Sequence, residues 1–183
     1  RKLRAAEGTE GYSGLGKALS IAISSSVAEA ASRALGIQIY EWVAEEGRRR
    51  SIPVPMGVII SNQHGLRRRS GDVSSFLAYP VNARTITQSI RALKELHIET
   101  FKLLSKEDGF FLGGMNEEGA WITSLPETEV LRILREASDL VKSKLGVELA
   151  IGLDFAASYL WDDRLGMYVY EKTGVFRTKE EQI

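Results

Sequence analysis

The segment Ile151-Gly152-Leu153-Asp154-Phe155-Ala156-Ala157-Ser158 places a single carboxylate at the end of an apolar run of strand length. In an α/β barrel, a lone acid at the carboxyl end of a strand points toward the mouth of the barrel, where metals and substrates bind. The run begins at Leu149, so we expect a buried strand over residues 149–154. Asp154 is therefore predicted to be a metal ligand.

The composition is that of an ordinary globular protein. The 183 residues are 44% hydrophobic, and 24 Lys plus Arg balance 24 Asp plus Glu. This balance leaves no global field that would recruit nucleic acid, an acidic membrane or a polyanion. The chain contains no cysteine, which excludes disulfides and thiolate metal sites and fits a reducing compartment. Because no apolar run is long enough to cross a bilayer, we expect a soluble, cytoplasmic protein without a membrane partner.

Helical periodicity dominates the first fifty residues. Apolar side chains recur at helical spacing over residues 13–35, and Gly36 follows as a stop signal. A shorter helix is expected over residues 39–44. The polar run 45–50 and the sequence Pro53-Val54-Pro55 then indicate a junction. We therefore divide the chain into a helical part, residues 1–52, and a second domain, residues 53–183.

The second domain alternates strand and helix patterns. Strands are expected over 56–60 and 75–81, helices over 85–104 and 126–145, and a short strand over 167–170 after a turn at 162–166. Ser124 and Glu127 have the spacing of a capping box for the second of these helices, and Thr178 and Glu181 have the same spacing near the end of the chain. A helix that stops within its first turn cannot bury a face, so we expect the chain to be a piece of a longer protein.

Several separated motifs resemble the enolase family, and they occur in the family's order along nearly the whole chain. The motifs that carry the resemblance are, in chain order, Gly8-Thr9-Glu10 with Ser13, Leu15 and Gly16, then Ile39-Tyr40, Pro53-Val54-Pro55 with Val58-Ile59 and His64, Phe76 with Pro80-Val81, Asn116-Glu117-Glu118-Gly119, Ile151 to Ser158, and Glu180-Glu181-Gln182-Ile183. The resemblance implies an α/β fold: the end of an N-terminal domain, followed by the first part of a barrel that begins β-β-α-α.

The resemblance also implies a reaction and a set of partners. Enolases interconvert 2-phosphoglycerate and phosphoenolpyruvate with Mg²⁺, because a divalent cation is needed to absorb the charge that builds up when a proton beside a carboxylate is removed. A small anionic substrate and a homodimer are expected accordingly. The other metal carboxylates and both active-site lysines of the family lie on later barrel strands, so this chain alone is not expected to catalyse the reaction.

Three residues of this chain match functional positions of the family. Asp154 matches the first of three metal carboxylates, Glu117 matches a carboxylate that helps the hydroxide leave, and His64 matches a histidine on a loop near the substrate phosphate. His97 matches no motif, and we interpret it as structural.

The sequence also departs from the family pattern. Ser75 stands where the family has a second catalytic glutamate, Asn116 replaces the aspartate beside Glu117, and Tyr159 replaces a glutamate. A shift of the loop could bring Asp72 to the place of the lost glutamate, but we do not favour this. The departures leave open a second hypothesis, a catalytically inactive enolase homologue that acts as a binding or structural protein.

Two arginine clusters could attract phosphate groups. Arg48-Arg49-Arg50 and Arg67-Arg68-Arg69 are basic, but they lack interleaved aromatic residues. We therefore interpret them as solvated loops and expect no nucleic-acid partner. Because the second cluster follows His64, it could instead draw a small anionic substrate toward the barrel mouth.

Overall fold

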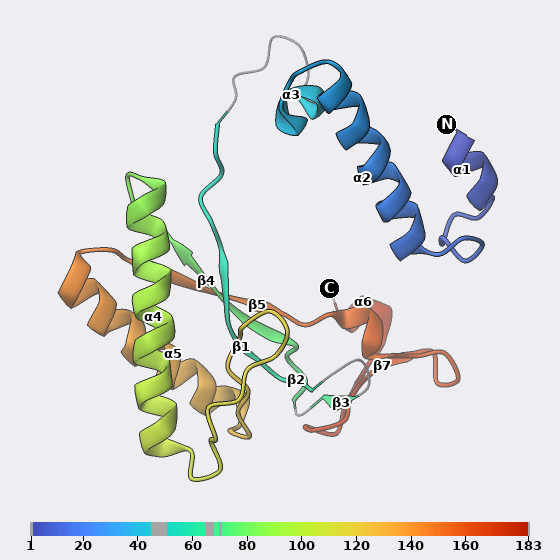
Figure 1. The fold of residues 1–183 in the computed structure, drawn as a ribbon. Helices are drawn as coiled ribbons and strands as arrows, with labels where there is room; N and C mark the ends of the chain where they lie inside the picture. The colour runs from blue at the N-terminus through green and yellow to red at the C-terminus, as the bar shows by residue number, and fades with distance from the viewer. Residues whose placement is uncertain (1, 45–50, 65–67, 70, 183) are drawn as a thin grey trace. The chain divides into compact units, whose positions relative to one another are not determined.

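The protein consists of two compact units, Arg1–Ser51 and Ile52–Ile183, in a computed structural model (Figure 1). The structure describes residues 2–44, 51–64, 68–69 and 71–182, and at residues 63, 64, 68 and 69 it describes the backbone alone. In these ranges no helix is long and apolar enough to cross a membrane.

The N-terminal unit contains helices α1 (Lys2–Glu7), α2 (Lys17–Ala34) and α3 (Ile39–Val43). The helix that we expected from residue 13 begins at Lys17. Its first predicted turn is instead a loop held by the buried Glu7 carboxylate, which accepts hydrogen bonds from the Thr9 hydroxyl and from the amides of Gly14 and Leu15 at 2.5–2.8 Å. The stop at Gly36 is confirmed, because this glycine adopts a left-handed conformation with φ 69°.

The burial along α2 is the reverse of that expected for an amphipathic helix. Its buried residues are Ser20 and Ser32, whereas Leu19, Ile23 and Val27 are exposed. Apolar burial normally supplies most of the stability of a surface helix. Within the described ranges, the N-terminal unit therefore has little apolar core of its own.

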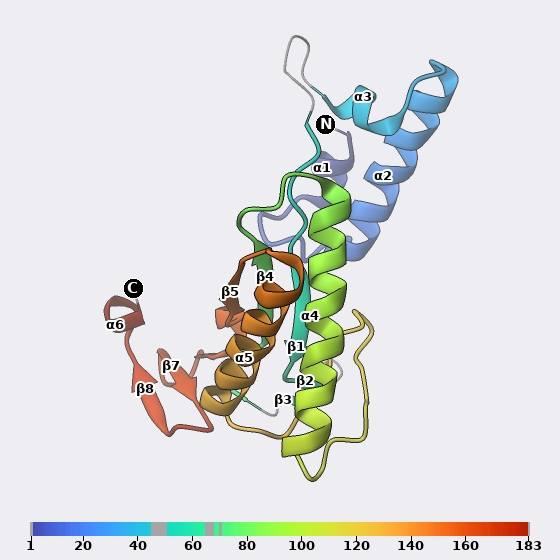
Figure 2. The same cartoon turned by 90° about the vertical axis from the view of Figure 1, so that its left-hand side faces the viewer.

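The second unit is built on an antiparallel sheet in the order β1 (Gly57–Ser61), β4 (Ser75–Pro80) and β5 (Leu149–Asp154). The register pairs Ser61 with Ser75, and Ser75 with Asp154. Helices α4 (Ile86–Glu107) and α5 (Glu127–Leu145) lie side by side against the sheet (Figures 1 and 2). The expected order of two strands, two helices and a strand is confirmed.

The main core lies between this sheet and the two helices. Its largest fully buried apolar side chains come from all five elements or the turns beside them, namely Ile60, Phe76, Leu96, Leu104, Val130, Ile133, Leu134, Val141 and Val147. The hydrophobic periodicity that predicted α4 and α5 is the periodicity of these buried positions. The core thereby fixes the sheet whose end carries Asp154.

The capping box that we predicted for α5 is wrong. The N-cap residue is Pro126, and its side chain makes no capping hydrogen bond. The Ser124 hydroxyl instead donates to Asp108, and Glu127 Oε1 accepts the backbone N–H of Asp72 at 2.8 Å. Both polar side chains thus serve tertiary contacts, which the sequence spacing alone does not reveal.

The remaining strands form two smaller sheets rather than a continuation of a barrel. Strands β2 (Gln63–His64) and β3 (Arg68–Arg69) pair with each other, and β6 (Trp161–Asp162), β7 (Met167–Tyr170) and β8 (Val175–Arg177) form the third sheet. The mixed α/β content is confirmed, but the described strands do not close into a barrel. A barrel of this class closes eight strands into one sheet, whereas the largest sheets among the described residues have three strands each.

The capping box near the end of the chain is confirmed. Helix α6 (Lys179–Gln182) follows Thr178, whose hydroxyl accepts the Glu181 amide while the Glu181 carboxylate accepts the Thr178 amide. These two reciprocal hydrogen bonds satisfy two backbone N–H groups at the start of the helix.

Candidate functional site

Asp154 is the last residue of β5, and its side chain is exposed. Its Oδ1 atom accepts the backbone N–H of Ala156 at 2.7 Å, which begins the turn after the strand. Ala156 has φ 41°, a left-handed conformation that alanine rarely adopts and that is found more often at functional sites than elsewhere. The strand thus ends abruptly, with a solvent-accessible carboxylate beside a strained residue.

The described residues do not form a complete metal site. Across the described ranges, no group of three or more His, Cys, Asp or Glu side chains is arranged to hold a metal ion. The exposed Asp154 carboxylate has the hard oxygen atoms that Mg²⁺ prefers. It is suited to serve as one ligand of such an ion, and the described residues do not complete a set of three around it.

Glu117 lies in a four-residue turn, Asn116 to Gly119, and its side chain is exposed. The Asn116 side chain organises the turn, because its Oδ1 atom accepts the amides of Glu118 and Ala120, both at 3.0 Å. An aspartate in this position would supply the same acceptor atom. The replacement of the family's aspartate by Asn116 is therefore compatible with the turn.

The segment that carries Glu117 is fastened at its base by Asp108, which directly follows α4. The buried Asp108 carboxylate accepts hydrogen bonds from the Phe110 amide at one end and from Thr123 and Ser124 at the other, at 2.6–3.3 Å. Burial alone would raise the pKa of Asp108, but these hydrogen bonds outweigh it and hold the pKa below its usual value. We did not predict this role, and a lone aspartate at the end of a helix gives no signal for it.

An aromatic cluster supports the same segment against α4. Trp121 stacks on His97 with ring centroids 4.4 Å apart, and the Phe101 and Phe111 ring centroids lie 5.0 and 5.9 Å from that of Trp121. The Trp121 backbone bonds to Ile59 and Ser61 of β1 at 2.9 Å. The interpretation of His97 as a structural residue agrees with these contacts.

The two carboxylates that the sequence singles out are not brought into contact. Trp121, near Glu117, pairs with β1 at one side of the sheet, whereas Asp154 ends β5 at the other. Three strand spacings separate these positions, roughly 14 Å of sheet width. The described chain thus holds two parts of a candidate site rather than one assembled centre.

The structure describes the predicted phosphate contact His64 and the two arginine clusters only in part. His64 has a described backbone in β2, paired with Arg68, but its side chain lies outside the described residues. The cluster Arg48-Arg49-Arg50 and Arg67 also lie outside the described residues.

Ser75 stands where the resemblance implies a second catalytic glutamate, and Asp72 is the nearby acid that could have replaced it. Ser75 is buried and lies directly across from Asp154. The buried Asp72 carboxylate accepts hydrogen bonds from the amides of Lys172 and Thr173 and from the Thr173 hydroxyl, at 3.1–3.3 Å. Asp72 therefore ties the start of β4 to the turn between β7 and β8, and it is not available to replace the glutamate.

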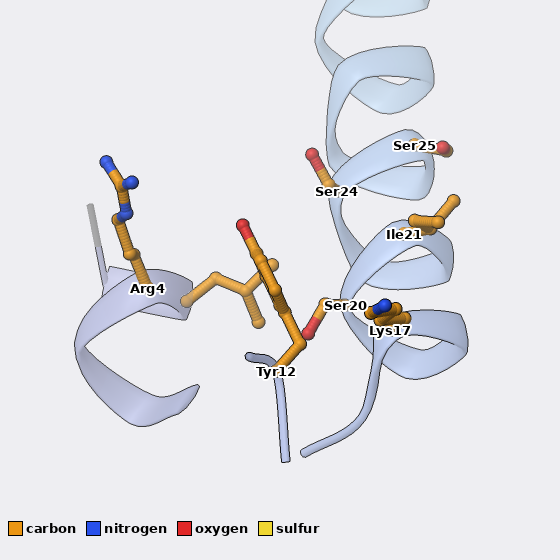
Figure 3. A pocket seen from close by; sticks show the side chains of 8 residues that line it. Arg4, Tyr12, Lys17, Ser20, Ile21, Ser24 and Ser25 are labelled. Atoms are coloured by element: carbon orange, nitrogen blue, oxygen red, sulfur yellow. The ribbon is translucent and has the colours of Figure 1, made fainter. Parts of the chain in front are cut away.

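A separate pocket lies in the N-terminal unit, between α1 and α2 (Figure 3). Figure 3 shows Tyr12 between the two helices, with Ser20 and Ser24 on the α2 side. Its two cations, Arg4 and Lys17, are exposed, so solvent and salt screen their charges. We assign no chemistry to this pocket.

The chain is similar to known enolases over almost all of its length. Residues 49–183 match the family profile described as "Enolase, C-terminal TIM barrel domain". The protein named "Enolase" of Pyrobaculum aerophilum is 39% identical over 181 residues, and those of Archaeoglobus fulgidus and Methanothermobacter thermautotrophicus are 36% and 34% identical over 183 and 181 residues. In each case the match covers 99% of this chain but only 42–43% of the relative. The chain thus spans about two fifths of the length of these relatives.

Proposed function

The chain belongs to the enolase family, and from this premise we propose that the complete protein dehydrates 2-phosphoglycerate to phosphoenolpyruvate with the help of Mg²⁺. Residues 1–52 would be the end of the N-terminal domain, and residues 53–183 the first part of the barrel domain. The observation that carries the proposal is the exposed carboxylate of Asp154 at the carboxyl end of β5, in a segment matched by the barrel profile.

Each candidate residue would have a distinct role. Asp154 would supply one oxygen ligand to Mg²⁺, which stabilises negative charge on the substrate when it is bound. Glu117 would donate a proton to the departing hydroxide, and His64 would contact the phosphate group. In a closed barrel the ends of separated strands meet at a common mouth, so we expect the complete protein to bring Asp154 and the turn of Glu117 to the same site.

The decisive experiment measures turnover of 2-phosphoglycerate by the full-length protein with and without Mg²⁺. We expect Mg²⁺-dependent activity, and we expect Asp154→Asn to abolish it. Glu117→Gln should reduce kcat by about 10²–10⁴-fold, the usual contribution of a positioned general acid. Glu118→Gln is the matched control, because Glu118 is an exposed acid in the same turn and should leave kcat within twofold. Full activity of Asp154→Asn would contradict the assignment.

A second candidate function is that of a catalytically inactive homologue that acts as a binding or structural protein. Two observations favour it: Ser75 lies across from Asp154 where the family has a glutamate, and Asp72 is held by three hydrogen bonds to residues 172–173. Calorimetric binding of 2-phosphoglycerate to the full-length protein in the absence of any turnover would support this function, and measurable turnover would exclude it.

Family resemblance further suggests a cytoplasmic homodimer. Light scattering of the purified full-length protein would measure its mass in solution, and a monomeric mass over the working concentration range would contradict the dimer.

A further inference from the structure

His97 connects the middle of α4 to the turn that carries Glu117. Its Nε2 atom lies 2.9 Å from the carbonyl oxygen of Gly119. In the opposite direction, the indole N–H of Trp121 donates to the carbonyl oxygen of His97 at 2.9 Å. Together with the stacked rings, these contacts join α4 and residues 119–121 by two hydrogen bonds and an aromatic pair.

The geometry fixes the direction of the His97 hydrogen bond. The Gly119 carbonyl oxygen can only accept, so the Nε2 atom of His97 must carry the proton. Gly119 closes the turn, since its own amide donates to the Asn116 carbonyl at 3.0 Å. The histidine therefore holds a peptide group only two residues beyond Glu117.

The turn needs such support because its own restraints are short-range. Gly119 has φ 79°, a conformation open chiefly to glycine, and glycine is the residue with the most backbone freedom to lose. The hydrogen bonds of Asn116 link residues only two to four positions apart. By contrast, the hydrogen bond from His97 spans 22 residues and ties the turn to a helix of the core.

We propose that His97 is a positioning residue, which holds the Asn116–Gly119 turn through the Gly119 carbonyl and so fixes where the Glu117 carboxylate is presented. The consequence for catalysis rests on the proposed function, in which Glu117 is the proton donor. The restraint on the turn does not, because it follows from the contacts alone.

Two variants separate the hydrogen bond from the aromatic stack. His97→Phe keeps a flat ring against Trp121 but removes the donor, whereas His97→Gln loses the ring but retains an N–H donor at a similar reach. If the donor positions the turn, Phe should disturb it and Gln should not. A purely structural role in packing predicts the opposite order.

The test is made on the full-length protein with two readouts. Hydrogen exchange of the amides of residues 116–120 should be about two- to tenfold faster in His97→Phe than in the wild type, the effect of losing one ordinary hydrogen bond. It should be near the wild-type rate in His97→Gln, while exchange within α5 stays unchanged in both. In the assay with 2-phosphoglycerate, His97→Phe should lower kcat with little change in KM, and His97→Gln should restore kcat.

The outcomes distinguish this inference from the proposed function. If exchange is faster in His97→Gln than in His97→Phe, or equal in both variants, the positioning role is wrong. If the exchange results are as expected but the wild-type protein shows no turnover, the positioning of the turn stands and the enolase reaction is what fails. If exchange is as expected and kcat of an active protein does not change, Glu117 is not positioned for catalysis by His97.

Discussion

Helix α2 of the N-terminal unit and helix α5 of the second unit are nearly equal in length, but they bury opposite kinds of side chain. The buried residues of α2 are two serines, whereas those of α5 include Val130, Ile133, Leu134 and Val141. Both helices show apolar residues at helical spacing in the sequence. The spacing therefore predicts a helix in each case, but it does not tell whether its apolar face is covered.

The difference shows that the two units are stabilised by different kinds of contact. In the second unit, α4, α5 and the sheet enclose an apolar core. In the N-terminal unit, within the described residues, the buried Glu7 carboxylate holds a loop by hydrogen bonds from Thr9, Gly14 and Leu15. Apolar burial contributes about 25 cal/mol per Å², so the second unit is expected to have the larger share of stability.

The strongest test of this comparison truncates one leucine in each unit. Leu134 is completely buried, and Leu134→Ala should lower the free energy of unfolding of the second unit by about 2–5 kcal/mol. Leu19 is 48% exposed, and Leu19→Ala should change stability by less than about 0.5 kcal/mol. Urea unfolding of the 183-residue chain, followed by circular dichroism, measures both changes. Equal losses would mean that Leu19 packs in a core that the described contacts do not contain.

A second prediction concerns the buried carboxylate in each unit that organises a loop. Asp108→Asn replaces an oxygen acceptor of Asp108 by an amide donor facing the donors of Thr123 and Ser124. This should destabilise the second unit by about 1–3 kcal/mol. The matched change, Glu7→Gln, should loosen the loop of residues 9–15 without lowering the unfolding midpoint of the second unit. Urea unfolding of the second unit, with proteolysis of the loop as the local probe, separates the two effects.

The same two carboxylates predict a dependence on pH. Hydrogen bonds lower the pKa of Asp108 despite its burial, and a hydrogen bond from Thr9 is the largest cause of the lowered pKa of Glu7. A carboxyl whose pKa is lower in the folded state stabilises that state fully above its unfolded pKa, near 4, and loses this contribution as the pH falls through the folded pKa. Stability should therefore decline below about pH 4. The decline should be shallower in Asp108→Asn; an unchanged slope would contradict the role of Asp108.

Much of the fold follows from local sequence signals. The strand over 149–154 is the predicted one, and α4 and α5 begin or end within three residues of the expected limits. These segments are recognisable because their hydrophobic period matches the face that they bury. The observed start of α2 differs from the expected one because the Glu7 carboxylate accepts the amides of Gly14 and Leu15. The capping box expected for α5 is absent because Ser124 bonds to Asp108 and Glu127 bonds to Asp72 instead.

The candidate site is less accessible to sequence reasoning than the fold. The position of Asp154 at a strand end follows from the apolar run before it. The turn that exposes Glu117 agrees with the turn-forming residues on either side of it, Asn116 and Gly119. The role of the residues behind the turn does not follow, because the contact of His97 with Gly119 spans 22 residues and that of Asp72 with Thr173 spans 101. Such pairs are set by packing of the core, which no local pattern encodes.

The smallest predicted effect compares an ion pair in each unit. Lys144 of α5 bonds to Glu95 and Glu99 of α4 at 2.8 and 2.6 Å, and the Glu99 side chain is only 7% exposed. Arg33 of α2 pairs with Glu29 on the same helix, where both side chains are exposed. Lys144→Gln should therefore lower the unfolding midpoint slightly, and Arg33→Gln should leave it unchanged.

Salt distinguishes the two pairs further. Exposed ion pairs are screened at high ionic strength, whereas a carboxylate that is largely buried keeps most of its interaction. Hydrogen bonds from Lys102 and then Lys144 lower the pKa of Glu99, so removing one lysine leaves this carboxylate less well compensated. The effect of Lys144→Gln should persist in part when urea unfolding is repeated at 1 M salt. If it vanishes, the contact between α4 and α5 through Glu99 is only a surface interaction, and the stability of the second unit depends on its apolar core alone.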